Sequence, residues 1–260
     1  MSILGQTSLL LTATVRPDSA FSQTHANVAD PQQRQDQYVA ALRYYLQQHP
    51  GFGHYVLAEN SDADLEAIRH AVADLPAADR LHTLALPNHP GNAAFGKGYG
   101  ESMLIRDALA ASDQLAHAPH VVKVTGRLRI ANLSAIAENR GRPYRLLCDL
   151  RDHQVYRRLG LSWSGQHCET RMVGFAPTLY QQHLAHLTDA WTDGEYSIEG
   201  RWYNVAKQLE DQPQIYLRFC REPHYIGVGG RGGKAYGQGV DRVKRLARAT
   251  GRRLVPGFRF

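Results

Sequence analysis

Cysteine is scarce in this chain of 260 residues, which holds only Cys148, Cys168 and Cys220. Three cysteines without paired spacing predict neither a disulfide framework nor a cysteine-based zinc site, and they fit a reducing compartment. Glycine and proline, with 23 and 12 residues, are also far from abundant. Their level excludes collagen-like and low-complexity classes.

Long apolar runs are missing as well. The run at residues 9–15 is far shorter than a membrane span, and no lysine or arginine precedes it as in a signal peptide. We expect it to form a buried strand. Hydrophobic residues make up 43% of the chain and charged residues 21%, which supplies a sizeable core and excludes disorder for most of the chain.

Positive charge is concentrated near the C-terminal end. The formal net charge is +6, yet residues 218–260 hold eleven lysines and arginines against only Glu222 and Asp241. The rest of the chain is therefore slightly acidic. Such a basic segment attracts a polyanion, a phosphorylated ligand or an anionic membrane surface. The charge alone does not show which of these three is the binding partner.

Strand and helix patterns alternate in the first half of the chain. We predict strands over residues 8–15, 54–58, 81–86 and 120–124, and helices over 32–48, 61–73 and 100–111. Parallel strands need crossover helices, so the alternation predicts an α/β fold with a mainly parallel, doubly wound sheet. Ligands bind beyond the carboxyl ends of such strands, where this chain carries polar residues.

The second half of the chain is less regular. We predict strands over residues 145–150 and 170–176, helices over 178–187, 196–209 and 240–250, and a glycine-rich loop over 227–239. Val240, Val243 and Leu246 form an apolar side of the last helix. That side could pack on the core while the basic face is solvated, or the helix could lie on anionic lipid.

Two segments combine glycine with positive charge. Gly96 to Glu101 opens a helix, where backbone N–H groups and Lys97 could hold a phosphate, although it is neither a Walker loop nor a Rossmann turn. Lys123 and Arg127 end the fourth strand, and either solvent or a bound anion must receive their charges. Alternatively, Gly96 to Glu101 is only a flexible loop, and Lys123 and Arg127 are only solvated at the end of their strand.

Several carboxylates could serve as a general base. The candidates are Asp149, Asp152, Glu169, Glu195 and Glu199. Spacing alone does not show which of them lies near an acceptor hydroxyl, and each could be a surface carboxylate. The 13 histidines form no H-x-x-x-H or H-E-x-x-H pattern, so no metal site is predicted.

Several short segments together resemble bacterial glycosyltransferases of surface-polysaccharide loci, such as those for O-antigen, capsule or lipopolysaccharide. The segments are Leu10–Thr14, Arg34–Tyr38, Glu59–Ser61, Gly96–Glu101, Lys123–Arg127 with Asn132, and Glu222-Pro223 ahead of Gly233-Lys234. The resemblance covers most of the chain and implies the GT-A class, an α/β domain with an acceptor-binding extension. It implies a nucleotide-sugar-binding half at residues 1–131 and an acceptor-binding half at 132–260, joined in one continuous domain.

The resemblance also implies a ligand set and its residues. The donor is a nucleotide-diphosphate sugar, with a UDP-sugar favoured, and the acceptor is a glycan or lipid-linked glycan at the cytoplasmic face of the membrane. The implied donor-binding residues are Thr12, Ala13, Glu59, Asn60, Ser61, Lys97, Gly98, Tyr99, Glu101, Lys123, Thr125, Gly126, Arg127, Arg231 and Lys234. The implied catalytic base is Glu199, with Asp152 and Glu169 as reserves.

One departure from the GT-A pattern concerns metal. GT-A enzymes carry an Asp-x-Asp at the end of the fourth strand to hold a divalent ion, and this chain has Thr125-Gly126-Arg127 there. We therefore expect no metal cofactor. Cationic side chains would neutralise the departing diphosphate instead.

Two rival interpretations remain. A nucleic-acid-binding protein would use the glycine-rich loop and the helix from Arg242 to Arg253 to track phosphates. It leaves the polar strand ends without a role, and we expect no nucleic-acid partner. A transferase that uses another phosphorylated donor keeps the same site and changes only the substrate.

Overall fold

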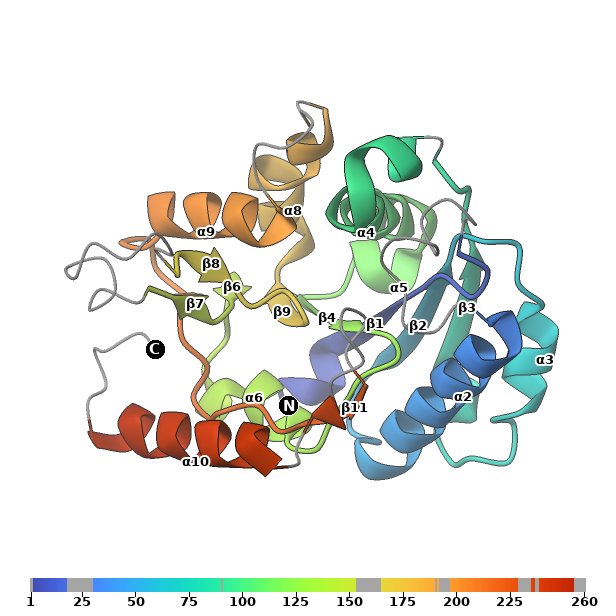
Figure 1. Cartoon of the computed structure of the whole chain (residues 1–260), viewed down its shortest axis with the longest axis horizontal. Helices are drawn as coiled ribbons and strands as arrows, with labels where there is room; N and C mark the ends of the chain where they lie inside the picture. Colours follow the sequence, from blue (N-terminus) through green and yellow to red (C-terminus); the bar gives the residue numbers. More distant parts are fainter. Residues whose placement is uncertain are drawn as a thin grey trace.

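Helices surround one large sheet in the computed structural model, as Figure 1 shows. The structure describes residues 2–17, 30–89, 91–152, 165–189, 191, 197–228, 235–236 and 239–254. Its strands are β1 (Thr7–Ala13), β2 (His54–Glu59), β3 (Leu81–Ala85), β4 (His120–Thr125), β5 (Arg129–Ile130), β6 (Leu146–Leu147), β7 (Leu150–Arg151), β8 (His167–Cys168), β9 (Met172–Phe175), β10 (Ile215–Tyr216), β11 (Tyr225–Val228) and β12 (Ala235–Tyr236). Its α-helices are α2 (Pro31–Gln48), α3 (Leu65–His70), α4 (Gly91–Ala111), α5 (Asp113–Ala116), α6 (Leu133–Ala137), α8 (Pro177–His183), α9 (Ile198–Gln208) and α10 (Gly239–Leu254).

Seven strands form the main sheet in the order β10-β6-β9-β4-β1-β2-β3. Strands β9 and β4 pair antiparallel, as do β9 and β6, and every other neighbouring pair is parallel. The predicted α/β class with a mainly parallel sheet is thus confirmed. The strand predicted over residues 145–150 is wrong as a single strand, because it divides into β6 and β7, and β7 pairs with β8 in a separate small sheet.

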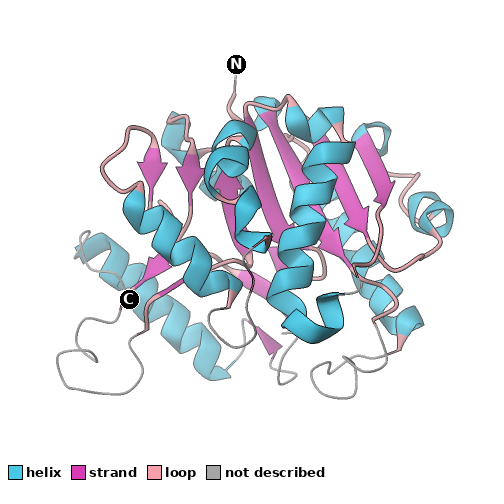
Figure 2. Ribbon diagram, turned by 90° about the horizontal axis from the view of Figure 1, so that it is seen from above, coloured by secondary structure: helices cyan, strands magenta, loops and turns pink. Residues whose placement is uncertain are grey.

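Strand β1 lies at the centre of the fold and is buried along its whole length. Leu9 and Leu11 pack into the apolar cluster that α2 covers, with Leu42 among its members. Leu10 faces the opposite way, into the cluster that contains Leu104 of α4. Alternate side chains therefore anchor helices on both faces of the sheet, which explains why the run reads as continuously apolar. Figure 2 looks onto the face of the sheet and shows helices lying across the strands.

Local sequence signals define the ends of the first helices. Asp30 accepts N–H bonds at the start of α2, where Pro31 occupies the first turn. Asp64 caps α3, which ends at His70 and not near residue 73 as predicted. Gly96 has a φ of 81° and interrupts α4 at the glycine-rich segment, so that helical residues lie on both sides of it.

Helix α10 lies where a helix was predicted but extends to Leu254, beyond the predicted end at residue 250, and its apolar side does not pack on the core, which was one of the two alternatives. Val243 is 67% exposed and Leu246 is 51% exposed. Arg248 and Arg252 of the same helix point inward and form ion pairs with Glu222. The arginine side of the helix is therefore the docked side, and the alternative in which the basic face is solvated is wrong for these two residues.

The sheet changes winding direction between β1 and β4. The chain proceeds from β1 to β2 and β3 on one side, and β4 then pairs with the other side of β1. At such a point the loops leaving two adjacent strands diverge and leave room for a ligand beyond their carboxyl ends. The turn at Gly126 follows β4 there, and Gly126 N–H donates to the carbonyl of Thr12 over 3.1 Å.

We expect Gly126→Ala to destabilise the protein by about 1–3 kcal/mol, because the new methyl group would overpack the turn. A Cβ at Gly126 would lie 2.6 Å from the Thr12 carbonyl oxygen and 3.1 Å from the Tyr38 ring. Urea denaturation measures the change in the free energy of unfolding. Gly5→Ala is the matched control, since nothing lies within 4 Å of the added Cβ; equal effects of the two substitutions would contradict the close contact.

Candidate functional site

Polar residues from distant parts of the chain meet at one edge of the main sheet. Thr12 of β1 is in register with Thr125 of β4, and Ala13 is in register with Glu59 of β2. Because β9 is antiparallel, its first residue, Met172, pairs with Val124 near the same edge. Segments near residues 12, 59, 125 and 170 therefore lie side by side.

A buried ion pair joins α4 to the end of β4. Lys123 Nζ lies 2.5 Å from Glu101 Oε1, and its side chain is fully buried. Glu101 also accepts a hydrogen bond from Thr12 Oγ1 at 3.2 Å. Burial opposes ionisation of Glu101, but the charges of Lys123 and Lys97 and these hydrogen bonds outweigh it and lower its pKa. The Lys123 charge is thus received by a carboxylate of the chain itself, which the sequence analysis did not foresee.

Glu59 organises the loop beyond β1. Its carboxylate accepts N–H bonds from Val15, Ser61 and Ala63, and it is only 1% exposed. Asn60 Oδ1 accepts the Thr14 hydroxyl at 2.7 Å. These residues lie where they were predicted, but their polar atoms are engaged by the protein, and direct contact of Glu59 with a nucleoside stays a prediction.

Two arginines approach the switch point from α2 and from the turn after β4. Arg34 is nearly buried, and its Nε donates to the Thr14 carbonyl at 2.8 Å. Burial lowers the pKa of Arg34, and the nearby charge of Arg127 contributes to the shift. Arg127 is fixed by a 2.9 Å hydrogen bond from its Nη1 to Gln37. Two like charges held together at a strand end form a setting that an anion would stabilise.

The glycine-rich segment of α4 contacts the start of α9. A Cβ on Gly98 would lie 3.1 Å from the backbone nitrogen of Ile198, so a larger residue here would force the two segments apart by a few tenths of an ångström. The contact places Gly98 against Ile198, the residue that precedes Glu199 in the first turn of α9. Tyr99 packs edge-on against Trp191, with ring centres 5.6 Å apart. The predicted donor segment and the predicted catalytic base are therefore neighbours in space.

A second buried carboxylate, Glu169, precedes β9. Arg171 Nε donates to Glu169 over 2.6 Å, and Arg151 Nη2 donates over 3.0 Å. Burial opposes its ionisation, but the hydrogen bonds and charge of Arg171, with the charge of Arg151, lower the pKa of Glu169 to about 2. The Arg171 guanidinium also lies 4.0 Å from the ring centre of Tyr225. Glu169 is thus an ionised structural anchor at neutral pH.

His167 was missed by the sequence analysis because no motif surrounds it. It lies on β8 and is half-buried. Burial, aided by the charge of Arg151, holds the pKa of His167 below its usual range, while Glu169 and Glu199 act in the opposite direction. A neutral imidazole therefore sits within electrostatic range of two of the three predicted catalytic carboxylates. Asp152, the third, is buried directly after β7.

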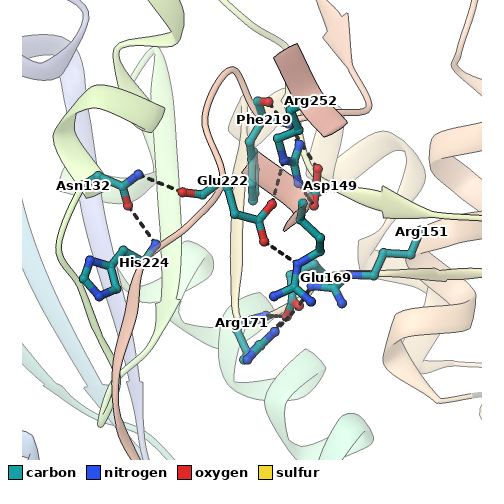
Figure 3. Close-up of polar contacts among 10 residues, drawn as sticks. Asn132, Asp149, Arg151, Glu169, Arg171, Phe219, Glu222, His224 and Arg252 are labelled. Atoms are coloured by element: carbon teal, nitrogen blue, oxygen red, sulfur yellow. Dashed lines mark hydrogen bonds and ion pairs between the residues drawn. The ribbon is translucent and has the colours of Figure 1, made fainter. Parts of the chain in front are cut away.

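The polar network continues from Glu169 to helix α10, as Figure 3 shows. Glu169 N–H donates to the Asp149 carbonyl, and Asp149 Oδ2 lies 2.5 Å from Arg252 Nη2. Arg252 Nε also donates to Glu222 at 2.7 Å. Asn132 stands at the start of α6 without a side-chain capping bond, and its amide bridges the Glu222 carbonyl and the His224 N–H instead. This network ties the last helix to the same sheet edge.

Seven of the predicted site residues form two hydrogen-bonded groups. Thr12, Glu101, Lys123 and Thr125 form one hydrogen-bonded group, since Thr125 Oγ1 reaches Glu101 Oε1 at 3.4 Å. Glu59, Asn60 and Ser61 form a second group with the loop after β1. Arg231, Lys234 and the candidate Glu195 lie outside the described residues.

Comparison with solved structures finds similar chains. The chain is similar to the crystal structure of an active-site mutant of LgtC, at 11% sequence identity and a TM-score of 0.49, over 93% of this chain and 95% of that one. No protein-family model and no curated protein matches the chain. Among the residues that the structure describes, no group of three or more histidine, cysteine or acidic side chains could hold a metal ion.

We expect Glu169→Gln to lower the free energy of unfolding at pH 7 by about 3 kcal/mol, because it leaves the partly buried charges of Arg151 and Arg171 without their shared carboxylate. The pKa of Glu169 is lowered from 4.5 to about 2, so its stabilisation is complete above pH 4.5 and is lost as the pH falls towards 2. The stability difference between wild type and variant should therefore narrow below pH 4.5.

Urea denaturation at several pH values measures this difference. Glu66→Gln is the control, because Glu66 forms an exposed i,i+3 pair with Arg69 on α3 and its loss should cost under about 0.5 kcal/mol. A Glu169→Gln deficit that is the same at pH 7 and pH 3 would show that the carboxylate charge is not what stabilises the cluster.

Proposed function

We propose that the protein is a glycosyltransferase of the GT-A type that moves a sugar from a nucleotide-diphosphate donor to a growing glycan. The observation that carries the proposal is the convergence of separate sequence motifs at the β1/β4 switch point. Segments around Thr12, Glu59, Glu101 and Thr125 meet there although they are far apart in the chain. In an open α/β sheet this is where a nucleotide is expected to bind.

The donor would occupy the space beyond β1, β2 and β4. The backbone and side chains after β2 face the nucleoside in this proposal, and Arg34, Arg127 and Lys97 supply positive potential for the diphosphate. A UDP-sugar is the favoured donor. Because cations can stabilise a departing diphosphate, we propose catalysis without a divalent metal.

The acceptor would approach from the side of α9 and β8. Glu199 is half-exposed in the first turn of α9, whereas Glu169 is held by two arginines and has a pKa of about 2. A group that is so weakly basic transfers protons poorly as a general base near neutral pH. We therefore rank Glu199 ahead of Glu169 and Asp152. The acceptor we propose is a lipid-linked glycan of a bacterial surface polysaccharide at the cytoplasmic face of the membrane.

A thermal-shift screen against UDP, GDP, CDP and CMP tests the donor class. A nucleotide at about one hundred times its dissociation constant adds roughly 2.7 kcal/mol of stability, which should raise the melting temperature by about 5 °C or more. We expect UDP to give the largest shift. A shift with RNA or duplex DNA but with none of the nucleotides would favour the nucleic-acid interpretation and refute the transferase.

Arg127→Ala should weaken nucleoside-diphosphate binding by about ten- to a hundredfold, because a charged hydrogen bond is worth roughly 1.5–3 kcal/mol. Calorimetric titration of UDP and of uridine measures the change. Uridine binding should be nearly unaffected, since Arg127 is assigned to the diphosphate. Arg69→Ala, on the exposed surface of α3, is the matched control; equal UDP affinity in all three proteins would remove Arg127 from the donor site.

Glu199→Gln should reduce turnover by about 10²–10⁴-fold while leaving the nucleotide affinity unchanged, if it is the general base. Turnover is measured as nucleoside-diphosphate release from the sugar nucleotide that binds best, with water as acceptor, both without and with excess EDTA. Glu210→Gln, beyond the far end of α9, is the control. Near-normal turnover of the Glu199 variant would move the role to another group, and activity lost only in EDTA would refute metal-independent catalysis.

A further inference from the structure

Helix α10 exposes an apolar stripe on the outside of the protein. Among the described residues the exposed large hydrophobic side chains are Phe95 of α4 and three of α10, namely Val243 (67%), Leu246 (51%) and Leu254 (76%). Ala247 and Thr250 are exposed between them. The positions 243, 246, 247, 250 and 254 recur at helical spacing, so they form a single face. Figure 1 shows α10 along an outer margin of the molecule.

Ion pairs hold α10 with its apolar side facing outward and two of its arginines facing the protein. Arg248 Nε lies 2.6 Å from Glu222, and Arg252 reaches both Glu222 and Asp149. Glu222 and Asp149 are buried, so releasing the arginines to solvent would leave two buried carboxylates unpaired, which is strongly unfavourable. The helix therefore cannot simply turn its apolar side inward.

The charges beside the stripe indicate what covers it. Arg242, Lys244 and Arg253 are exposed on the same helix, and residues 242–254 contain no acidic residue. An apolar face flanked by cations suits the boundary between anionic lipid headgroups and acyl chains. A helix of this kind lies on a bilayer; none of the described helices is long and apolar enough to cross one.

We propose that α10 is a membrane-docking helix whose Val243, Leu246 and Leu254 side chains insert into an anionic lipid surface, with Arg242, Lys244 and Arg253 in the headgroup layer. Membrane docking would bring the protein to the proposed lipid-linked acceptor, and only this link to the acceptor rests on the proposed function. Because Arg252 is bound to Asp149 and Glu222 at the carboxyl edge of the sheet, docking α10 places the acceptor-binding half next to the bilayer. An acceptor held in the membrane by its lipid is then within reach without leaving it.

Co-sedimentation of the full chain with lipid vesicles tests the proposal without donor or acceptor present. We expect binding to vesicles of phosphatidylcholine mixed with phosphatidylglycerol, little binding to phosphatidylcholine alone, and weaker binding as salt is raised. Leu246→Gln should reduce the affinity about tenfold or more, since burying a leucine side chain is worth about 1.5–3 kcal/mol. Arg242→Gln should weaken binding less, by about fivefold for one surface charge.

Matched controls distinguish vesicle binding through this face of α10 from non-specific binding. Arg69→Gln removes an equivalent exposed charge from α3, and it should bind vesicles like the wild type. Lack of binding to the anionic vesicles, or equal binding by wild type and Leu246→Gln, would overturn the proposal. A concentration-dependent dimer that Leu246→Gln converts to monomer would instead assign the stripe to a second copy of the chain.

The vesicle assay and the nucleotide assays fail independently. Binding to vesicles without binding to any nucleotide would support the membrane-docking helix and refute the glycosyltransferase. Binding to UDP without binding to vesicles would support the glycosyltransferase and refute the membrane-docking helix.

Discussion

The buried pair of Lys123 and Glu101 is the interaction on which the rest of this structure depends. It connects α4 to β4 at the switch point, and Lys123 Nζ also donates to the Thr170 carbonyl over 2.9 Å. One ammonium group thus joins the first half of the chain to the segment that leads into β9. Removing either charge would leave the other buried and unpaired, which is far more costly than loss of a surface salt bridge.

A second electrostatic network extends this edge towards the C-terminal end. Glu169 binds Arg151 and Arg171, while Asp149 and Glu222 bind the arginines of α10. Each carboxylate is buried and paired, so the network both stabilises the irregular second half and fixes the orientation of α10. The carboxyl edge of the sheet and the outward apolar stripe of α10 are therefore held in one arrangement by charge pairing.

Local patterns predicted the elements of the first half well because their signals are strong. Continuous apolar strands with helical segments between them can form little other than a parallel sheet with crossovers, and polar strand ends must then share an edge. The second half was predicted less well. Its strands are two to four residues long, too short for periodicity to register, and residues 145–150 were therefore assigned to one strand.

The sequence by itself determined the α/β class, the run of polar groups beyond the strands and the concentration of positive charge in the last helix. Only the tertiary structure decided which charges meet. The partner of Lys123 is 22 residues away and that of Arg252 is 103 residues away, and no local pattern encodes contacts of that range. Periodicity likewise identifies an apolar side of α10 but not the direction it faces. That direction was decided by the buried carboxylates of Glu222 and Asp149, because leaving them without Arg248 and Arg252 would cost more than burial of Val243, Leu246 and Leu254 would gain.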